Sequence, residues 1–175
     1  SNAAVSREDY VEFLRTRYGL SVGLSNKFGD LMKNCVVRAL DSGSTFHVSS
    51  KEGMEEAVFI QELKEKIPVE TAGGIEVPQY CATIPVNLGN VKALETVCLP
   101  DSPDLAAMGK LVREEGMKFR WEEWDPVLKD SDNVQIPLLV VGNVPLIVTP
   151  ALLNFFKELE AFNSENMDKE KLDEL

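Results

Sequence analysis

The chain has 175 residues, which is enough for one domain with a substantial core. Its net charge of −11 argues against nucleic acid and against an anionic membrane surface, because both of these partners attract a positive face. No apolar run approaches the roughly 18 residues of a membrane span, so we expect a soluble protein without a span.

The ends of the chain leave its cellular location open. Residues 1–3 are Ser-Asn-Ala, which is typical of the remnant of a removed tag. No methionine follows them, so we expect the native chain to extend before Ala4. At the other end, residues 163–175 are polar and acidic, and we expect a frayed helix or a mobile tail there.

The first region, residues 4–89, is predicted to be helical at its start. Ser6 and Asp9 are typical of a helix N-cap, and Gly19 is expected to end that helix. A second helix is predicted over residues 25–40, because apolar residues recur there every three or four positions. Cys35 lies on that apolar stripe and is interpreted as a buried core residue.

The rest of this region is predicted to alternate turns with short elements. Residues 41–44 read Asp-Ser-Gly-Ser and predict a turn, and residues 45–49 predict a strand with His47 exposed. Residues 50–67 predict a helix, although their middle also suits a strand. Gly73-Gly74 predicts a turn between two extended pieces, and Cys81 is expected in a strand core.

The second region, residues 90–162, begins with a predicted β-α-β unit. Residues 92–99 predict a strand, Ser102 is expected to cap a helix that ends before Gly116, and residues 117–124 predict another strand. Such a unit is expected to be parallel and right-handed.

A hairpin and a closing helix are predicted after that unit. Residues 126–133 predict a polar loop, and residues 136–141 predict a strand that turns at Gly142-Asn143. The partner strand should cover residues 144–148, and Thr149 followed by Pro150 indicates the start of the last helix. The fold class is therefore α+β, in part α/β, with a helical N-terminal region and a β-α-β-β-β-α C-terminal unit.

This C-terminal unit resembles the thioredoxin-like fold in its glutaredoxin and glutathione-transferase N-terminal form. Residues 99–105 stand where that family has its loop-and-helix redox motif, and Ile136-Pro137 where it has an apolar residue and a cis-proline. Residues 148–153 resemble the hairpin exit that holds the glutamyl end of glutathione. The resemblance covers about residues 91–162, under half of the chain.

The resemblance implies candidate site residues, but this sequence lacks the cysteine that the family uses as its catalyst. Ser102 stands where glutaredoxins have a nucleophilic cysteine, so dithiol chemistry is not expected, although some transferases use a serine hydroxyl with glutathione. Pro137 and Thr149 stand at ligand-binding positions, and Cys98 is close to the motif in sequence. Ser102 and Thr149 are also interpreted as plain helix caps.

The histidine and cysteine content makes other sites hard to build. The chain has one histidine, His47, and three cysteines without a CxxC spacing, so neither a metal site nor a disulfide framework is expected. The leading hypothesis is a redox-inactive thioredoxin-like module that binds an unknown protein partner without a cofactor. The alternatives are a glutathione-dependent transferase that uses Ser102 and a structural domain of a larger protein.

Overall fold

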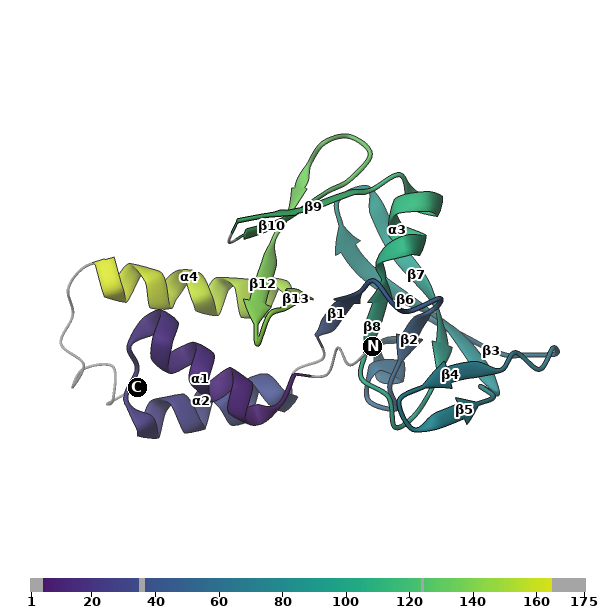
Figure 1. Ribbon diagram of the computed structural model, residues 1–175, viewed down its shortest axis with the longest axis horizontal. Helices are drawn as coiled ribbons and strands as arrows, with labels where there is room; N and C mark the ends of the chain where they lie inside the picture. Colours follow the sequence, from purple (N-terminus) through teal and green to yellow (C-terminus); the bar gives the residue numbers. More distant parts are fainter. Residues whose placement is uncertain (1–4, 35–36, 124, 165–175) are drawn as a thin grey trace.

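The protein is an α+β protein, as predicted (Figure 1). The structure is a computed structural model, and it describes residues 5–34, 37–123 and 125–164. Cys35 and the tail from residue 165 onward therefore lie outside the described residues. No described helix is long and apolar enough to cross a membrane.

Two helices open the chain, α1 (Arg7–Tyr18) and α2 (Val22–Asn34). The predicted cap of α1 is confirmed: the Asp9 N–H donates to the Ser6 hydroxyl, and the Ser6 N–H donates to the Asp9 carboxylate. Gly19 ends this helix with φ 63°, a left-handed conformation that glycine adopts without strain. Local capping chemistry thus suffices to place α1.

The strands and remaining helices follow in chain order. The first half contains β1 (Arg38–Asp41), β2 (His47–Ser49), the short 3-10 helix η1 (Gly53–Glu56), β3 (Phe59–Glu62), β4 (Val69–Thr71), β5 (Gly74–Glu76) and β6 (Tyr80–Leu88). The second half contains β7 (Val91–Cys98), β8 (Leu105–Ala107), α3 (Met108–Glu115), β9 (Lys118–Glu122), β10 (Asp125–Lys129), β11 (Gln135–Ile136), β12 (Leu138–Val141), β13 (Val144–Ile147) and α4 (Pro150–Ser164).

Eight of these strands form one mixed sheet in the order β12-β13-β1-β8-β2-β7-β6-β3. β1 is an inner strand, antiparallel to β13 and parallel to β8, with Asp41 level with Ala107. A smaller sheet has the order β11-β10-β9, and β4 and β5 form a separate hairpin. Strands from both sides of the expected boundary near residue 90 therefore share the large sheet.

The hydrophobic core has two parts. The larger cluster joins the helical layer to the sheet, and it includes Leu14 of α1, Phe156 of α4, Ala39 of β1 and Leu146 of β13. Figure 1 shows α1, α2 and α4 grouped at one end of the molecule, away from α3. The second cluster joins the large sheet to α3 and the small sheet, through residues such as Leu111 and Leu128.

Two helix predictions in the first region are wrong: one helix is shorter than predicted, and the other is not formed. The helix expected over residues 25–40 ends at Asn34, and residues 38–41 form β1, because pairing with β13 and β8 buries both faces of this segment. The helix expected over residues 50–67 is replaced by η1 and β3. Phe59 and Ile60 pair with β6, which confirms the strand considered for the middle of that segment.

The parallel β-α-β unit predicted for residues 92–124 is not formed. β7 belongs to the large sheet, whereas β9 pairs antiparallel with β10 in the small one. Residues 125–129 form β10, where the sequence predicted a loop. The mixed sheet does not by itself identify a thioredoxin-like fold, and that resemblance stays a prediction.

The predicted hairpin and closing helix are confirmed. β12 and β13 pair across the Gly142-Asn143 turn, and both turn residues have positive φ. α4 begins at Pro150, and the Thr149 hydroxyl accepts a hydrogen bond from the Leu152 N–H at 3.3 Å. All described peptide bonds are trans, that of Ile136-Pro137 included, so the cis-proline of the family is absent here.

Candidate functional site

Asp41 is the most unusual polar residue at the centre of the large sheet. It is the last residue of β1, the strand that lies between β13 and β8. Asp41 is only 5% exposed to solvent. Buried carboxylates are rare in proteins unless their oxygens are hydrogen-bonded or serve a function. The turn that follows β1 does not by itself explain why the Asp41 carboxylate is buried.

The turn after β1 holds the Asp41 carboxylate from the backbone. The Gly43 N–H donates to Asp41 Oδ1 at 2.8 Å. Ser42 and Gly43 are exposed although Asp41 is buried, so the carboxylate lies just beneath the molecular surface. A carboxyl oxygen held by a backbone N–H is fixed in direction, which is the preorganisation that acid-base chemistry needs.

A buried polar network lies at Arg38, the end of β1 opposite Asp41. The Arg38 guanidinium donates to the Val48 carbonyl at 2.8 Å and to Ser49 Oγ at 2.9 Å, and it lies 3.9 Å from Asp104. The Asp104 carboxylate accepts hydrogen bonds from the N–H and the hydroxyl of Ser50 at 2.9 and 2.8 Å. Burial lowers the pKa of Arg38, and Asp104 opposes this shift. The network ties β1, β2 and β8 together.

His47 is a buried residue of β2, the strand next to β8. It is 4% exposed, so the prediction of an exposed strand position is wrong. Its Nδ1 accepts the Ala107 N–H at 2.9 Å, which places the proton of the neutral ring on Nε2. Burial, together with the positive charges of Lys110 and Arg38, lowers the pKa of His47 to about 4 against a small opposing effect of Glu114. His47 is thus a neutral residue that braces β2 against β8.

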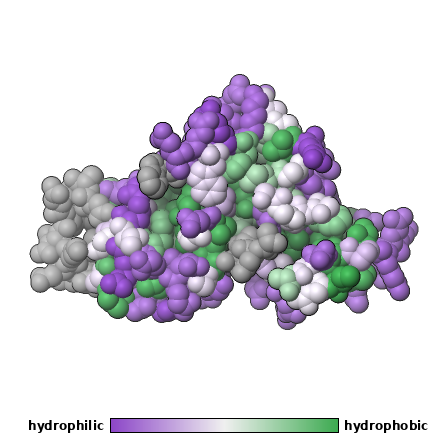
Figure 2. All heavy atoms as spheres, viewed as in Figure 1, coloured by the Kyte–Doolittle hydropathy of each residue, from purple (hydrophilic) through white to green (hydrophobic). Residues whose placement is uncertain are grey.

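An exposed apolar surface covers β3 and the region of the β4–β5 hairpin. Ile75 of β5 is 74% exposed, and Val58, Phe59 and Val77 are also exposed. Figure 2 shows hydrophobic residues gathered at the end of the molecule where Figure 1 places this hairpin. At the base of the hairpin, Val69 packs against the same core cluster as Phe46, which follows the Asp41 turn. Exposed apolar groups of this kind mark contact surfaces.

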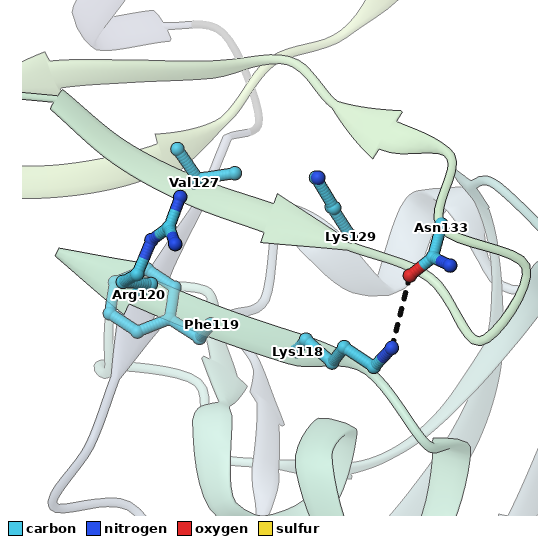
Figure 3. Close-up of a pocket in the computed structure, with 6 residues that line it drawn as sticks. All are labelled: Lys118, Phe119, Arg120, Val127, Lys129 and Asn133. Carbon is cyan, nitrogen blue, oxygen red and sulfur yellow. Dashed lines mark hydrogen bonds between the residues drawn. The ribbon is translucent and has the colours of Figure 1, made fainter.

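A basic pocket lies on the small sheet. It has a volume of about 380 Å³ and is lined by Lys118, Phe119, Arg120, Val127, Lys129 and Asn133. Figure 3 shows that these side chains come from β9, β10 and the loop after β10, with Lys118 Nζ donating to Asn133 Oδ1 at 3.0 Å. This pocket is separate from the large sheet that contains Asp41.

The sequence-predicted site residues are distributed over the large sheet. Pro137 and Thr149 flank the β12–β13 hairpin, and β1, β8 and β2 separate β13 from β7, which carries Cys98. Cys98 is half-buried, and burial together with Asp104 raises the pKa of its thiol. Raised thiol pKa values disfavour the reactive thiolate.

The prediction that Ser102 caps a helix is wrong. α3 begins at Met108, because residues 105–107 pair with β1 as strand β8 instead of forming a first helical turn. The Ser102 N–H donates to the Leu99 carbonyl at 3.0 Å, and its hydroxyl donates to the Pro103 carbonyl at 3.1 Å. Ser102 therefore belongs to the turn between β7 and β8.

Sequence reasoning missed Asp41 although a signal was present. A stretch of β-branched and aliphatic residues interrupted only by Arg38, Val36 to Leu40, leads directly into Asp41-Ser42-Gly43. Such a run predicts a buried strand, and a strand that delivers an aspartate to a tight glycine turn is a typical way to present a carboxylate. Interpreting residues 25–40 as one helix hid this pattern.

Neither comparison with known proteins nor a search for metal ligands identifies the protein. The chain matches no protein-family model, and no curated protein is similar to it. Among the described residues, no group of three or more histidine, cysteine, aspartate or glutamate side chains could hold a metal ion. The function must therefore be argued from the chemistry of Asp41 and its surroundings.

Proposed function

We propose that the protein is one half of an aspartic peptidase, in which Asp41 from each of two copies of the chain forms the catalytic pair. The observation that carries the proposal is the Asp41 carboxylate itself. It is buried at the end of an inner strand, is held by the Gly43 N–H and has exposed backbone directly after it.

A second copy supplies what one chain lacks. A two-fold axis brings any residue beside it close to its own counterpart, and two-fold dimers are the commonest oligomers. Two carboxylates a few ångströms apart hold one proton between them, because both cannot ionise together. One carboxylate then acts as a base and the other as an acid.

This pair has a direct use in peptide hydrolysis. The ionised carboxylate takes a proton from a water molecule while the water oxygen attacks the carbonyl carbon of the peptide. The protonated carboxyl donates its proton to the carbonyl oxygen, which gives a tetrahedral intermediate. The carboxyl that gained the water proton then donates it to the amide nitrogen, while the other carboxylate takes a proton from a hydroxyl group of the intermediate. The carbon–nitrogen bond breaks, the carboxylic acid and the amine leave, and the pair again holds one proton.

The surroundings of Asp41 fit this chemistry. His47 is neutral and its Nδ1 accepts the Ala107 N–H, so that ring nitrogen is not free to act as a base. The Arg38–Asp104 network holds β1 in place beside β8. The exposed apolar residues of the β4–β5 hairpin offer a surface for the side chains of an extended substrate, whereas four strands separate β3 from β1.

The test is cleavage of a mixed peptide library between pH 3 and pH 7, followed by mass spectrometry. Wild-type protein should cut peptides, and Asp41→Asn should lose cleavage by at least about 10³-fold while keeping its melting temperature. Asp101→Asn is the matched control, because Asp101 is exposed in the β7–β8 turn and should not affect the rate. Equal cleavage by Asp41→Asn and wild type would refute the proposal.

A protein-binding role is the second candidate, and the same exposed apolar surface favours it. In this case the hairpin region binds a partner polypeptide without cutting it, as the redox-inactive module inferred from the sequence would do. Stable capture of a peptide at this surface without any cleavage product would favour this role. Measurable thiol-disulfide exchange or glutathione conjugation would instead favour the transferase alternative, with Ser102 as its candidate residue.

A further inference from the structure

We infer that strand β9 and the basic pocket beside it bind an extended acidic peptide, which adds as a fourth strand to the small sheet. This site is separate from Asp41, and it stands whether or not the protein is a peptidase. Three features of the described residues point to such an occupant: the free edge, the charge and the shape of the pocket.

The first feature is the position of β9 at the edge of its sheet. The strand order is β11-β10-β9, and β9 pairs with β10 from Lys118 to Glu122. No other described strand pairs with β9, so one side of its backbone is available for a further strand. Extended peptides bind such edges through main-chain hydrogen bonds, and neighbouring pockets give them specificity.

The second feature is an unusual concentration of positive charge. Lys118 lies directly opposite Lys129, and Arg120 lies directly opposite Val127. Like charges opposite one another on two strands repel, so this arrangement is destabilising without a counter-anion. The whole chain carries a net charge of −11, which makes a cluster of three cations on one face exceptional. A negatively charged occupant would relieve the repulsion.

The polar groups nearby neutralise this cluster only in part, because Glu122 and Asp125 lie at the other end of the same face, opposite each other. Lys118 donates to the neutral amide of Asn133, and Arg120 lies 3.7 Å from Glu122, where both side chains are well exposed. An exposed pair of this kind contributes little, because water screens it. Lys129 completes the cluster from β10, on the face that Figure 3 shows with Arg120 and Val127.

The third feature is the apolar part of the pocket lining. Val127 lies on the same face as the cations and Phe119 on the other face of β9, and both residues are half-buried and line the hollow of about 380 Å³. A peptide strand beside β9 presents alternate residues to the two faces, so carboxylates on the cation face can alternate with aliphatic side chains on the face of Phe119.

The test uses a fluorescent eight-residue peptide of alternating glutamate and valine, measured by anisotropy. The full chain should bind this peptide, and binding should weaken as salt is raised. A peptide with glutamine in place of glutamate should bind at least about tenfold more weakly, and so should the variant Lys118→Gln/Lys129→Gln with the acidic peptide. The control variant Lys64→Gln/Lys66→Gln changes two exposed lysines elsewhere and should bind like wild type.

Two further readouts separate strand addition from simple charge attraction. The acidic peptide should slow hydrogen exchange of the amides in residues 118–122. Two peptides that are N-methylated on the one or the other alternate set of nitrogens should differ, because only the set that faces β9 is needed for binding. The inference is overturned if the glutamine peptide binds equally well, if Lys118→Gln/Lys129→Gln binds like wild type, or if both N-methylated peptides bind without loss. Circular dichroism of the double variant checks that it is folded.

Discussion

At the scale of single residues, burial decides what the polar groups of this protein can do. Asp41 and His47 lie on neighbouring parts of the sheet and are almost equally buried, yet their surroundings differ. His47 accepts a hydrogen bond and is neutral, whereas Asp41 accepts one from a glycine N–H in an exposed turn. The same degree of burial thus gives one structural residue and one candidate catalyst.

The buried His47 should make stability depend on pH. Its pKa of about 4 in the folded chain is below the value of about 6.5 for an unfolded histidine, so the unfolded state binds more protons between these values. The free energy of unfolding contributed by His47 is therefore fully present above about pH 6.5, and falls by at most about 3 kcal/mol as the pH drops to about 4.

Urea denaturation of wild type and His47→Gln at a series of pH values measures this effect. Glutamine can still accept the Ala107 N–H but does not titrate. The wild-type curve should therefore fall more steeply than the curve of the variant between pH 6.5 and pH 4. Parallel curves would contradict the neutral, buried state of His47.

At the scale of elements, local signals predicted some segments well and failed for others. The α1 cap, the β12–β13 hairpin and the start of α4 depend on Ser6, Gly142-Asn143 and Thr149-Pro150, whose effects are local. β1 and β8 were missed because their state is set by partners distant in sequence: Ala39 pairs with Leu105 and Leu146. Tertiary pairing overrides propensity in such segments.

The candidate site depended on those missed elements. Asp41 was visible as part of a turn, but only the position of β1 between β13 and β8 shows that its carboxylate is buried. The basic pocket was hidden for a similar reason, because residues 126–133 were expected to be a loop. Lys118 and Lys129 lie opposite each other in this pocket because β10 pairs with β9, and a loop would not place them so.

The Arg38 network should be the most sensitive polar element of the sheet. Arg38→Met should lower the free energy of unfolding by about 3 kcal/mol, because it leaves the Asp104 carboxylate, whose side chain is only 10% exposed, without its cation. Arg17→Met is the matched control: Arg17 pairs with Glu160 at 3.3 Å at an exposed site and should cost under about 1 kcal/mol. Chemical denaturation gives both values, and equal losses would contradict the role assigned to the network.

At the scale of the whole molecule, the helical layer and the large sheet share one core. The larger hydrophobic cluster includes Tyr10 and Leu14 of α1, Phe156 of α4 and strand residues such as Val48. A continuous core of this kind predicts one cooperative unfolding transition for the helices and the sheet together. The region before residue 90 and the region after it should therefore not unfold separately.

Phe156 provides the test of this shared core. It is buried, stacks on Tyr18 with ring centroids 5.8 Å apart and meets Phe13 edge-on at 5.9 Å. Phe156→Ala should cost about 3–5 kcal/mol and lower a single melting transition. Lys157→Ala, at the next and exposed position of α4, should leave that transition unchanged. Melting of Phe156→Ala in two separate steps by calorimetry would show that the helices and the sheet are independent.

The central claim is that two copies of Asp41 act together, and a subunit-mixing experiment tests it most directly. Wild type and Asp41→Asn are unfolded together, refolded at a fixed total concentration in varied proportions, and assayed for cleavage of a peptide substrate. If each active site needs Asp41 from both chains, activity follows the square of the wild-type fraction, so that an equal mixture keeps about a quarter of the activity. Activity that falls in direct proportion to the wild-type fraction would show that one Asp41 suffices, and would contradict the account.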